Sequence, residues 1–152
     1  GGWLTARVPH NFFLASRKEY SDFELQLEFR LSGDQTNAGV QLRSERIPDH
    51  HEMIGYQADL GQEYWGCLYD ESRRNCVLAA PDSDGLAAVL KKSDWNLCEG
   101  PRIQLWINGF QTVDYSEDVA AIPRTGRLGL QIHGGPPGEV RYRKLRIREI
   151  NR

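Results

Sequence analysis

The sequence predicts an all-β fold in which two antiparallel sheets pack as a β-sandwich or jelly roll. The clearest evidence is residues 22–31, where apolar and polar side chains alternate with a strict period of two, the pattern of a half-buried strand. Several shorter runs of strand-forming residues follow, separated by turn residues. The one helical candidate, residues 86–92, is too short to organise a fold.

The predicted strands follow one another along most of the chain. The first ends at Ser32-Gly33-Asp34, because such residues favour a turn. Between residues 102–107 and 111–115, the pair Asn108-Gly109 is typical of a two-residue hairpin turn. The other strands are expected at residues 38–44, 55–60, 65–69, 127–133 and 140–150.

The last predicted strand changes phase part-way along its length. Val140 and Tyr142 occupy one register, whereas Leu145 and Ile147 occupy the other. A β-bulge inserts one extra residue and shifts the register in this way. The sequence therefore predicts a bulge near Arg143-Lys144.

Length and composition indicate one globular domain, expected over residues 1–152. The formal net charge of -2 argues against a nucleic-acid-binding protein, and no apolar run is long enough for a membrane span. Cys67, Cys76 and Cys98 allow at most one disulfide and lack the spacing of a metal site. No signal-peptide pattern is present, and we interpret the abrupt start at Gly1-Gly2-Trp3 as that of a trimmed or mature fragment.

Polar residues with one parity recur in four of the predicted strands. If the apolar residues of these strands point inward and the strands are neighbours, one sheet face carries amides, a guanidinium, a carboxylate, an imidazole and an indole. Such groups match sugar hydroxyls, and an indole packs on the C–H face of a sugar ring. The alternative is an ordinary solvated sheet face. The residues are Gln41 and Arg43, Gln57 and Asp59, Gln104, Trp106 and Asn108, and Gln131 and His133.

The predicted loops add further polar and aromatic side chains. Residues 46–52 contain His50, His51 and Glu52, and imidazole and carboxylate ligands suit zinc, manganese or iron. Because adjacent ligands in a loop are weak evidence, a solvated polar loop is the alternative. Residues 63–66 and 69–74 supply aromatic and charged groups for the rim of a groove, although Asp70 and Glu71 could instead pair with neighbouring arginines in a surface turn.

Several strings, taken together and in order, resemble the 3-keto-disaccharide hydrolase domain family from about residue 2 to residue 150. They are KEYSDFEL at 18–25, NAGVQLR at 37–43, GYQAD at 55–59, WGCLYDESRR at 65–74, ING at 107–109 and GLQIHG at 129–134. The resemblance implies a concanavalin A-like jelly roll in an exported bacterial protein, periplasmic or secreted. It also implies cleavage of glycosides already oxidised to a ketone at C3. Two departures are a shortened segment at residues 95–100 and the lack of the family's N-terminal segment.

The family chemistry suggests roles for the polar residues. A C3 ketone acidifies the hydrogen on C2, so a base can remove it and the C1 substituent can leave by β-elimination. We expect His133 or Asp59 as the base, with Arg43 or a metal stabilising the oxyanion. The sugar would be held by Gln57, Gln131, Trp106, Asn108, Gln41, Trp65 and Tyr69. No cofactor is certain, and a divalent metal is the one candidate, with His51, Glu52, Asp59 and His133 as its ligands.

Other functions remain as alternatives. Direct hydrolysis usually needs two carboxylates. The predicted face offers only Asp59, and a second carboxylate would have to come from the loops, as Glu52, Glu63 or Asp70, which favours elimination. The same fold also serves as a non-catalytic carbohydrate-binding module, which would need the aromatic and amide residues but no base. A structural domain would leave the polar face without a ligand.

Overall fold

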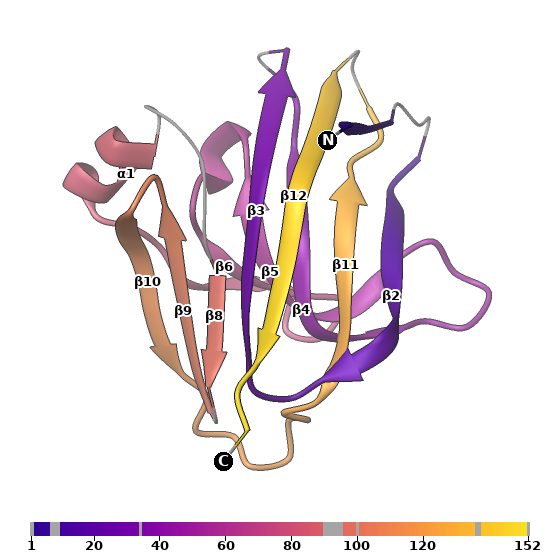
Figure 1. Ribbon diagram of the computed structural model, residues 1–152, viewed down its shortest axis with the longest axis vertical. Coiled ribbons are helices and arrows are strands. Elements are labelled where there is room, and N and C mark those ends of the chain that lie inside the picture. Colours follow the sequence, from indigo (N-terminus) through magenta and orange to yellow (C-terminus); the bar gives the residue numbers. More distant parts are fainter. Residues whose placement is uncertain are drawn as a thin grey trace.

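The structure, a computed structural model, confirms the predicted two-sheet antiparallel sandwich (Figure 1). It describes residues 2–6, 10–33, 35–89, 96–99, 101–135 and 138–151. Sheet I contains, in spatial order, β1 (Leu4–Ala6), β12 (Glu139–Glu149), β3 (Phe23–Ser32), β8 (Asn96–Glu99), β9 (Arg102–Ile107) and β10 (Phe110–Ser116). Sheet II contains β2 (Phe12–Tyr20), β11 (Gly126–Ile132), β4 (Ala38–Arg46), β5 (Met53–Leu60), β6 (Leu68–Glu71) and β7 (Cys76–Ala79).

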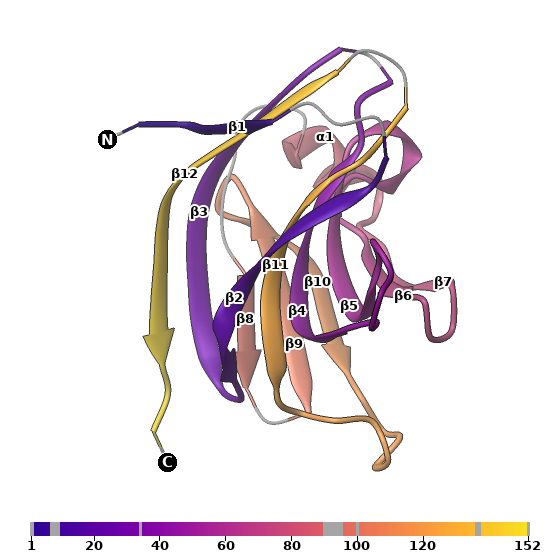
Figure 2. The same ribbon diagram turned by 90° about the vertical axis from the view of Figure 1, so that its right-hand side faces the viewer.

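The hydrophobic core lies between the two sheets. Seen from the side in Figure 2, β12 and β3 lie on one side of the molecule and β5 to β7 on the other. Inward-facing residues such as Phe23 and Leu27 of β3 and Val40 of β4 are buried there, as their alternation predicts. The hydroxyl of Tyr142 donates to the carbonyl oxygen of Gln131 over 2.8 Å, which joins β12 of sheet I to β11 of sheet II.

Two local predictions are confirmed. Asn108 and Gly109 connect β9 to β10 with φ angles of 61° and 77°, the left-handed values that a tight hairpin turn requires. In β12, the register against β3 shifts between Arg143 and Arg146, and Lys144 has a φ of 53°. This is the β-bulge expected at the change of phase.

The structure also contains strands that the sequence pattern did not reveal, namely β1, β2, β7 and β8. β2 is hidden because its register against β11 shifts between Arg127 and Gly129, which breaks the alternation. The shortened segment at 95–100 contains β8, which pairs with both β3 and β9.

Two predicted boundaries need correction. The strand predicted at 65–69 is β6, which begins at Leu68 because a short 3-10 helix (Gln62–Tyr64) and a turn come first. The helix α1 covers Ser83–Val89 and so starts earlier than predicted, while residues 90–92 lie outside the described residues. Within the part of the chain that the structure describes, no helix is long and apolar enough to span a membrane.

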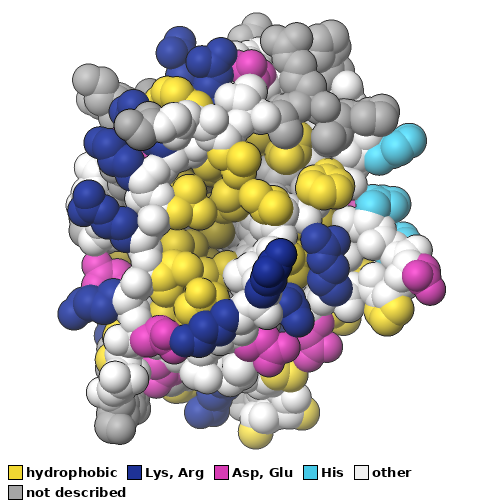
Figure 3. Space-filling view, turned by 45° about the vertical axis from the view of Figure 1, so that its right-hand side comes forward, with side chains coloured by type: hydrophobic (Ala, Val, Ile, Leu, Met, Phe, Trp, Pro, Cys, Tyr) yellow, Lys and Arg dark blue, Asp and Glu magenta, His cyan; other side chains and the backbone are white. Residues whose placement is uncertain are grey.

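One edge of the sandwich is open and apolar. Figure 3 shows hydrophobic side chains gathered in a hollow on this face. The hollow has a volume of about 250 Å³ and lies between β2 and β11 on one side and β3 and β12 on the other. Its lining includes Leu14 of β2 together with Leu145 and Ile147, which follow the β12 bulge, and all three side chains are 39–47% exposed. The core is therefore incompletely covered along this edge.

Candidate functional site

The outer face of sheet I is an ordinary solvated surface. Glu24 pairs with Arg148, and Glu28 pairs with Arg143 and Lys144, across β3 and β12. Exposed ion pairs of this kind contribute under about 1 kcal/mol each. These residues match the simpler interpretation of a polar, solvated sheet surface.

The outer face of sheet II carries a buried polar cluster. Gln41 of β4, Gln57 and Asp59 of β5, and Gln131 of β11 share this face, and the three strands are neighbours in the order β11-β4-β5. Each of the four side chains is at most 4% exposed. Buried amides and carboxyls need hydrogen-bond partners, and these residues find them largely in one another.

The cluster forms one continuous hydrogen-bond network. Ser44 Oγ donates to Gln41 Oε1 over 2.5 Å, and Gln41 Nε2 donates to Gln57 Oε1 over 2.8 Å. Gln57 Nε2 then donates to Asp59 Oδ1 over 2.8 Å and to Gln131 Oε1 over 3.2 Å. Each hydrogen is donated in the direction away from Ser44, and the network ends at Asp59 and Gln131.

Two glycines make room for this network. A Cβ atom at Gly39 would lie 2.7 Å from Gln57 Cδ, and a Cβ atom at Gly55 would lie 2.4 Å from Ser44 Oγ. Gly39 pairs with Asp59 in the neighbouring strand, so the amide of Gln57 reaches across the sheet over a residue that has no side chain. A larger residue at either position would displace a member of the network.

Beside the network the surface is hollowed into an open polar pocket of about 190 Å³, which we call the polar hollow. Tyr69 and Glu71 of β6 line it, and the ring of Tyr69 meets that of Tyr64 edge-to-face at 6.1 Å. Its amide, carboxyl, hydroxyl and imidazole groups are suited to sugar hydroxyls, and its aromatic rings to sugar C–H groups. The lining residues are Asn11, Asn37, Gln57, Asp59, Tyr64, Tyr69, Glu71, Gln131 and His133.

Asp59 and Glu71 are the carboxyl groups that line the polar hollow, and the pKa of each is raised. Burial raises the pKa of Asp59 to about 7. The charge of Glu71 also raises this pKa, whereas the hydrogen bond from Gln57 lowers it by a smaller amount than burial raises it. Burial, and then the charge of Glu52, raises the pKa of Glu71. Asp59 therefore changes protonation state near neutral pH, as a group in an acid–base site would.

His133 is exposed beside the hollow, and its ring is fixed by the backbone. His133 Nδ1 lies 2.5 Å from the carbonyl oxygen of Gly134, so in the neutral ring Nδ1 carries the hydrogen and Nε2 keeps its lone pair. Asn11 holds this segment, since it accepts from Gly134 N over 2.9 Å and donates to Glu52 over 2.8 Å. The neutral imidazole thus presents a basic nitrogen at Nε2.

Arg43 does not line the polar hollow, contrary to the prediction from parity. It lies in a bulge, where the register between β4 and β5 shifts and Arg43 has a φ of 50°. Because of this extra residue, Ser44 rather than Arg43 joins the outer face. The guanidinium instead donates from Nε to the carbonyl oxygen of Ser21 over 2.7 Å and pairs with Asp22.

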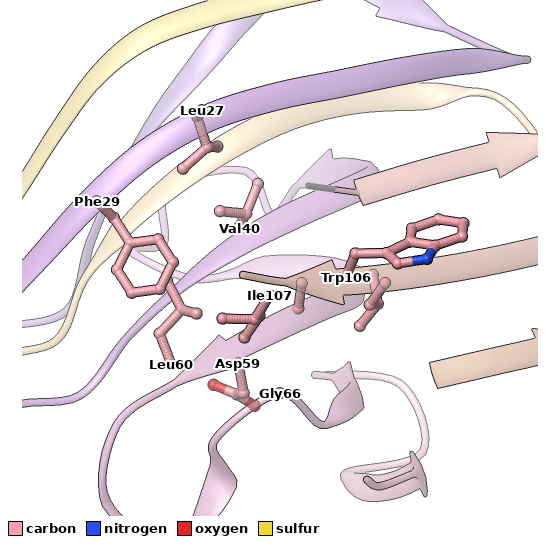
Figure 4. Close-up of a pocket in the computed structure, with 10 residues that line it drawn as sticks. Leu27, Phe29, Val40, Asp59, Leu60, Gly66, Trp106 and Ile107 are labelled. Carbon is pink, nitrogen blue, oxygen red and sulfur yellow. The ribbon is translucent and has the colours of Figure 1, made fainter. Parts of the chain in front are cut away.

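Trp106, Asn108 and Trp65 also lie outside the polar hollow. Trp106 belongs to β9 and Asn108 to the hairpin that follows it, so both are on sheet I and the prediction that they share the face of the amides is wrong. Figure 4, a view of a small core cavity of about 20 Å³, shows the Trp106 indole directed away from Asp59. Trp65 packs against Phe29, with ring centroids 6.3 Å apart.

The predicted metal ligands are not brought together as one set. His51 Nε2 lies 3.3 Å from Glu52, and its ring stacks on His50. Asp59 and His133 line the polar hollow, whereas the residues of the loop do not. Among the residues described, no three His, Cys, Asp or Glu side chains are arranged to hold a metal ion.

The sequence pattern indicated part of the polar hollow and missed the rest. Residues 63–66 and 69–74 do supply its rim, through Tyr64, Tyr69 and Glu71. Glu71 was not singled out as a site carboxylate, although its spacing of two from Tyr69 would have placed both on one face of an extended strand. Asn11 and Asn37 had no such signal, because they lie directly before β2 and β4 and so belong to no alternating strand pattern.

Comparisons with known proteins bear on the family and the fold of the chain. A family model described as a 3-keto-alpha-glucoside-1,2-lyase-like domain matches residues 1–148. No curated protein gives a significant match.

Solved structures share the jelly-roll fold at low sequence identity. Two candidate glycosyl hydrolases from Parabacteroides distasonis ATCC 8503 have TM-scores of 0.71 and 0.70 at 16% and 22% identity. Each comparison covers 98% of this chain, and 81% and 87% of those chains respectively. The carbohydrate-binding module CBM66 from Bacillus subtilis has a TM-score of 0.71 at 16% identity, over 97% of this chain and 91% of the module.

Proposed function

Because the chain belongs to the family of 3-keto-alpha-glucoside-1,2-lyase-like domains, we propose that it cleaves glycosides whose sugar carries a ketone at C3. The proposed reaction is β-elimination in the polar hollow. A base takes the hydrogen from C2 as a proton, and the C2–H electron pair forms an enolate with the C3 oxygen. The enolate then expels the C1 oxygen with its substituent, and this oxygen takes a proton from the protonated base or from water. The products are an unsaturated keto sugar and an alcohol, and later addition of water to the sugar gives net hydrolysis.

The observation that carries this proposal is the placement of Asp59, Glu71 and His133 in one polar hollow. C2 and the C3 oxygen are close together in a sugar, so elimination needs a base and a proton donor in the same hollow. The residues found to line it include no Lys or Arg. An acid or an imidazole of the polar hollow can instead meet the negative charge of the enolate.

We assign the base to His133 Nε2 and the stabilising hydrogen bond to Asp59. The neutral ring of His133 offers Nε2 as an acceptor because Nδ1 is held by Gly134. The pKa of Asp59 is about 7, so this carboxyl is protonated at lower pH. A neutral carboxylic acid can donate a hydrogen bond to an enolate oxygen. Because Asp59 Oδ1 accepts from Gln57, Oδ2 is the oxygen free to carry this proton.

The test is turnover of a p-nitrophenyl 3-keto-α-glucoside beside the unoxidised glucoside. We expect nitrophenolate from the keto form alone, together with the ultraviolet absorbance of a conjugated enone. Release without any transient enone absorbance would contradict elimination, and equal release from both substrates would contradict the need for the ketone.

Variants of Asp59 separate the two roles that this carboxyl can have. Asp59→Asn keeps a neutral hydrogen-bond donor, so we expect it to lose about tenfold in kcat, whereas Asp59→Ala loses about 100-fold or more. His133→Gln should lose about 100-fold or more because it has no basic nitrogen. Asp114→Asn, which changes a carboxyl on the outer face of sheet I, is the control. Full turnover in His133→Gln, or equal losses in both Asp59 variants, would overturn the assignment.

A second candidate function is non-catalytic sugar binding. The edge-to-face pair of Tyr64 and Tyr69 at the polar hollow supports it, because such rings pack on sugars without any chemistry. The likeness to the CBM66 module agrees with this candidate at the level of fold. Saturable sugar binding that is lost in Tyr69→Ala, with no turnover of the keto substrate, would favour the binding module.

A further inference from the structure

The hydrogen-bond network continues beneath the polar hollow to residues that do not line it. Gln41 and Ser44 are 0% exposed, and neither is among the lining residues. We propose that Ser44 and Gln41 are positioning residues that hold the Gln57 amide with its NH2 group toward Asp59 and Gln131. This inference rests on the proposed function only in taking the polar hollow as the reaction site.

The orientation of each amide dictates the orientation of the next. A carboxylate and a carbonyl oxygen only accept hydrogen bonds, so Gln57 must turn its NH2 group toward Asp59 and Gln131. Its own oxygen then faces Gln41, which must supply an N–H. The Gln41 oxygen is left facing Ser44, and only a hydroxyl hydrogen can satisfy it there.

The Ser44 hydroxyl is confined to the role of donor. Apart from Gln41 Oε1, its oxygen lies 3.1 Å from the carbonyl oxygen of Leu42 and 3.4 Å from that of Tyr56, and both of these groups are acceptors. No N–H group is among its hydrogen-bond partners in the described structure. The hydroxyl therefore ends the network with a fixed polarity.

The backbone places this hydroxyl where it is needed. The bulge at Arg43 brings Ser44 onto the outer face, and the bond from Arg43 to Ser21 holds the bulge. Gly55 leaves the space that Ser44 Oγ occupies. The bulge at Arg43 and the space at Gly55 thus position the Ser44 hydroxyl, which is linked to the Gln57 amide through two hydrogen bonds.

Reversal of the Gln57 amide would damage the site directly. Its oxygen would then face Gln131 Oε1 whatever the charge of Asp59, and would face a carboxylate as well whenever Asp59 is ionised, so acceptors would lie together with no hydrogen between them. Without Ser44 and Gln41, the Gln57 oxygen loses the N–H that favours the productive orientation, and only Asp59 and Gln131 are left to select it. The two residues therefore act on the reaction through Gln57, without touching the sugar.

The test uses Ser44→Ala and Gln41→Met in the intact protein, with Gln104→Met on the outer face of sheet I as the control. The first readout is the side-chain amide resonance of Gln57 in a nitrogen-15 NMR spectrum, assigned from its loss in Gln57→Met and recorded without substrate. We expect it to move in both variants, although the Ser44 hydroxyl is not hydrogen-bonded to Gln57 in the described structure, and to stay in place in the control. The second readout is turnover, where kcat should fall about tenfold with KM changed less.

The two readouts separate this inference from the proposed function. An unchanged Gln57 resonance in both variants would overturn the positioning role, as would full kcat in both. A moved resonance in a protein that turns over no keto substrate would support the positioning role and refute the proposed function. Thermal unfolding shows whether each variant is folded. If Gln41→Met does not fold, the test relies on the amide resonance and the turnover of Ser44→Ala, which removes only one oxygen atom.

Discussion

Arg74 Nη2 donates to Glu117 Oε2 over 2.6 Å, and this ion pair joins the two sheets of the sandwich. Arg74 lies in the turn between β6 and β7 of sheet II, whereas Glu117 follows β10 of sheet I. The hydroxyl of Tyr56 donates to the same oxygen over 2.6 Å. Arg74 also pairs with Asp70, whose side chain is 0% exposed. Asp70 therefore pairs with neighbouring arginines, as one of the two interpretations of the sequence had it, but in a largely buried network and not in a surface turn.

We expect Glu117→Gln to destabilise the fold by roughly 3 kcal/mol, because it removes one charge from a buried pair. Burial by itself would raise the pKa of Glu117, but bonds from Arg74, Tyr56 and Val119 outweigh it and lower the pKa to about 2. A lowered pKa gives stability above the unfolded-state value near 4.5, and this stability is lost as the pH falls toward 2.

The measurement is the free energy of unfolding by urea between neutral and acid pH. Below about pH 4.5, wild-type protein should lose stability as the pH falls further, and Glu117→Gln should lose less because it has no carboxyl to protonate at this position. Equal stability of the two proteins at neutral pH would contradict the prediction.

Asp59 should give the free energy of unfolding a pH dependence opposite to that given by Glu117. Its pKa is raised by burial to about 7, so the ionised form is less favourable in the folded protein than in the unfolded chain. Stability is therefore lost as the pH rises from the unfolded-state value through 7, by up to about 4 kcal/mol. Asp59→Asn should flatten this part of the curve, whereas Asp114→Asn should leave it unchanged. A wild-type stability that is constant between pH 5 and pH 8 would refute the raised pKa.

Glu71 should tune the protonation of Asp59. Its charge is one of the causes that raise the Asp59 pKa, so Glu71→Gln is expected to lower that pKa. If protonated Asp59 stabilises the enolate, the fall of kcat/KM at high pH should begin at a lower pH in Glu71→Gln. The pH–rate profile of the keto substrate measures this shift, and Glu19→Gln, at the far end of β2, is the control. A shift toward higher pH would contradict the proposed role of the protonated acid.

The sequence predicted those parts of the structure that local alternation controls. β3, β9, the Asn108-Gly109 hairpin and the β12 bulge follow from side chains that must face either the core or water. The network residues Gln41 and Gln57 were found for the same reason, and because their strands are neighbours.

The errors arose where long-range pairing or an extra residue decides the outcome. Parity assigned Arg43 to the outer face, but the bulge gives that place to Ser44. Parity also grouped Trp106 with the amides, although β9 pairs with β8 and β10 in the other sheet. Which sheet a strand joins depends on distant partners, so no local pattern could have revealed it.

Gly39 gives the sharpest test of the network by geometry alone. A Cβ at this position would lie 2.7 Å from both Cδ and Cγ of Gln57, closer than such atoms approach in folded proteins. Gly39→Ala should therefore push the Gln57 amide away from Asp59, lower kcat and leave the chain folded, because the amide is the movable partner.

Gly109→Ala is not a suitable control, because its φ of 77° makes any side chain strained there. Gly2→Ala meets no atom within 4 Å and serves instead. A Gly39→Ala protein with an unmoved Gln57 resonance and full turnover would show that the amide does not need this space.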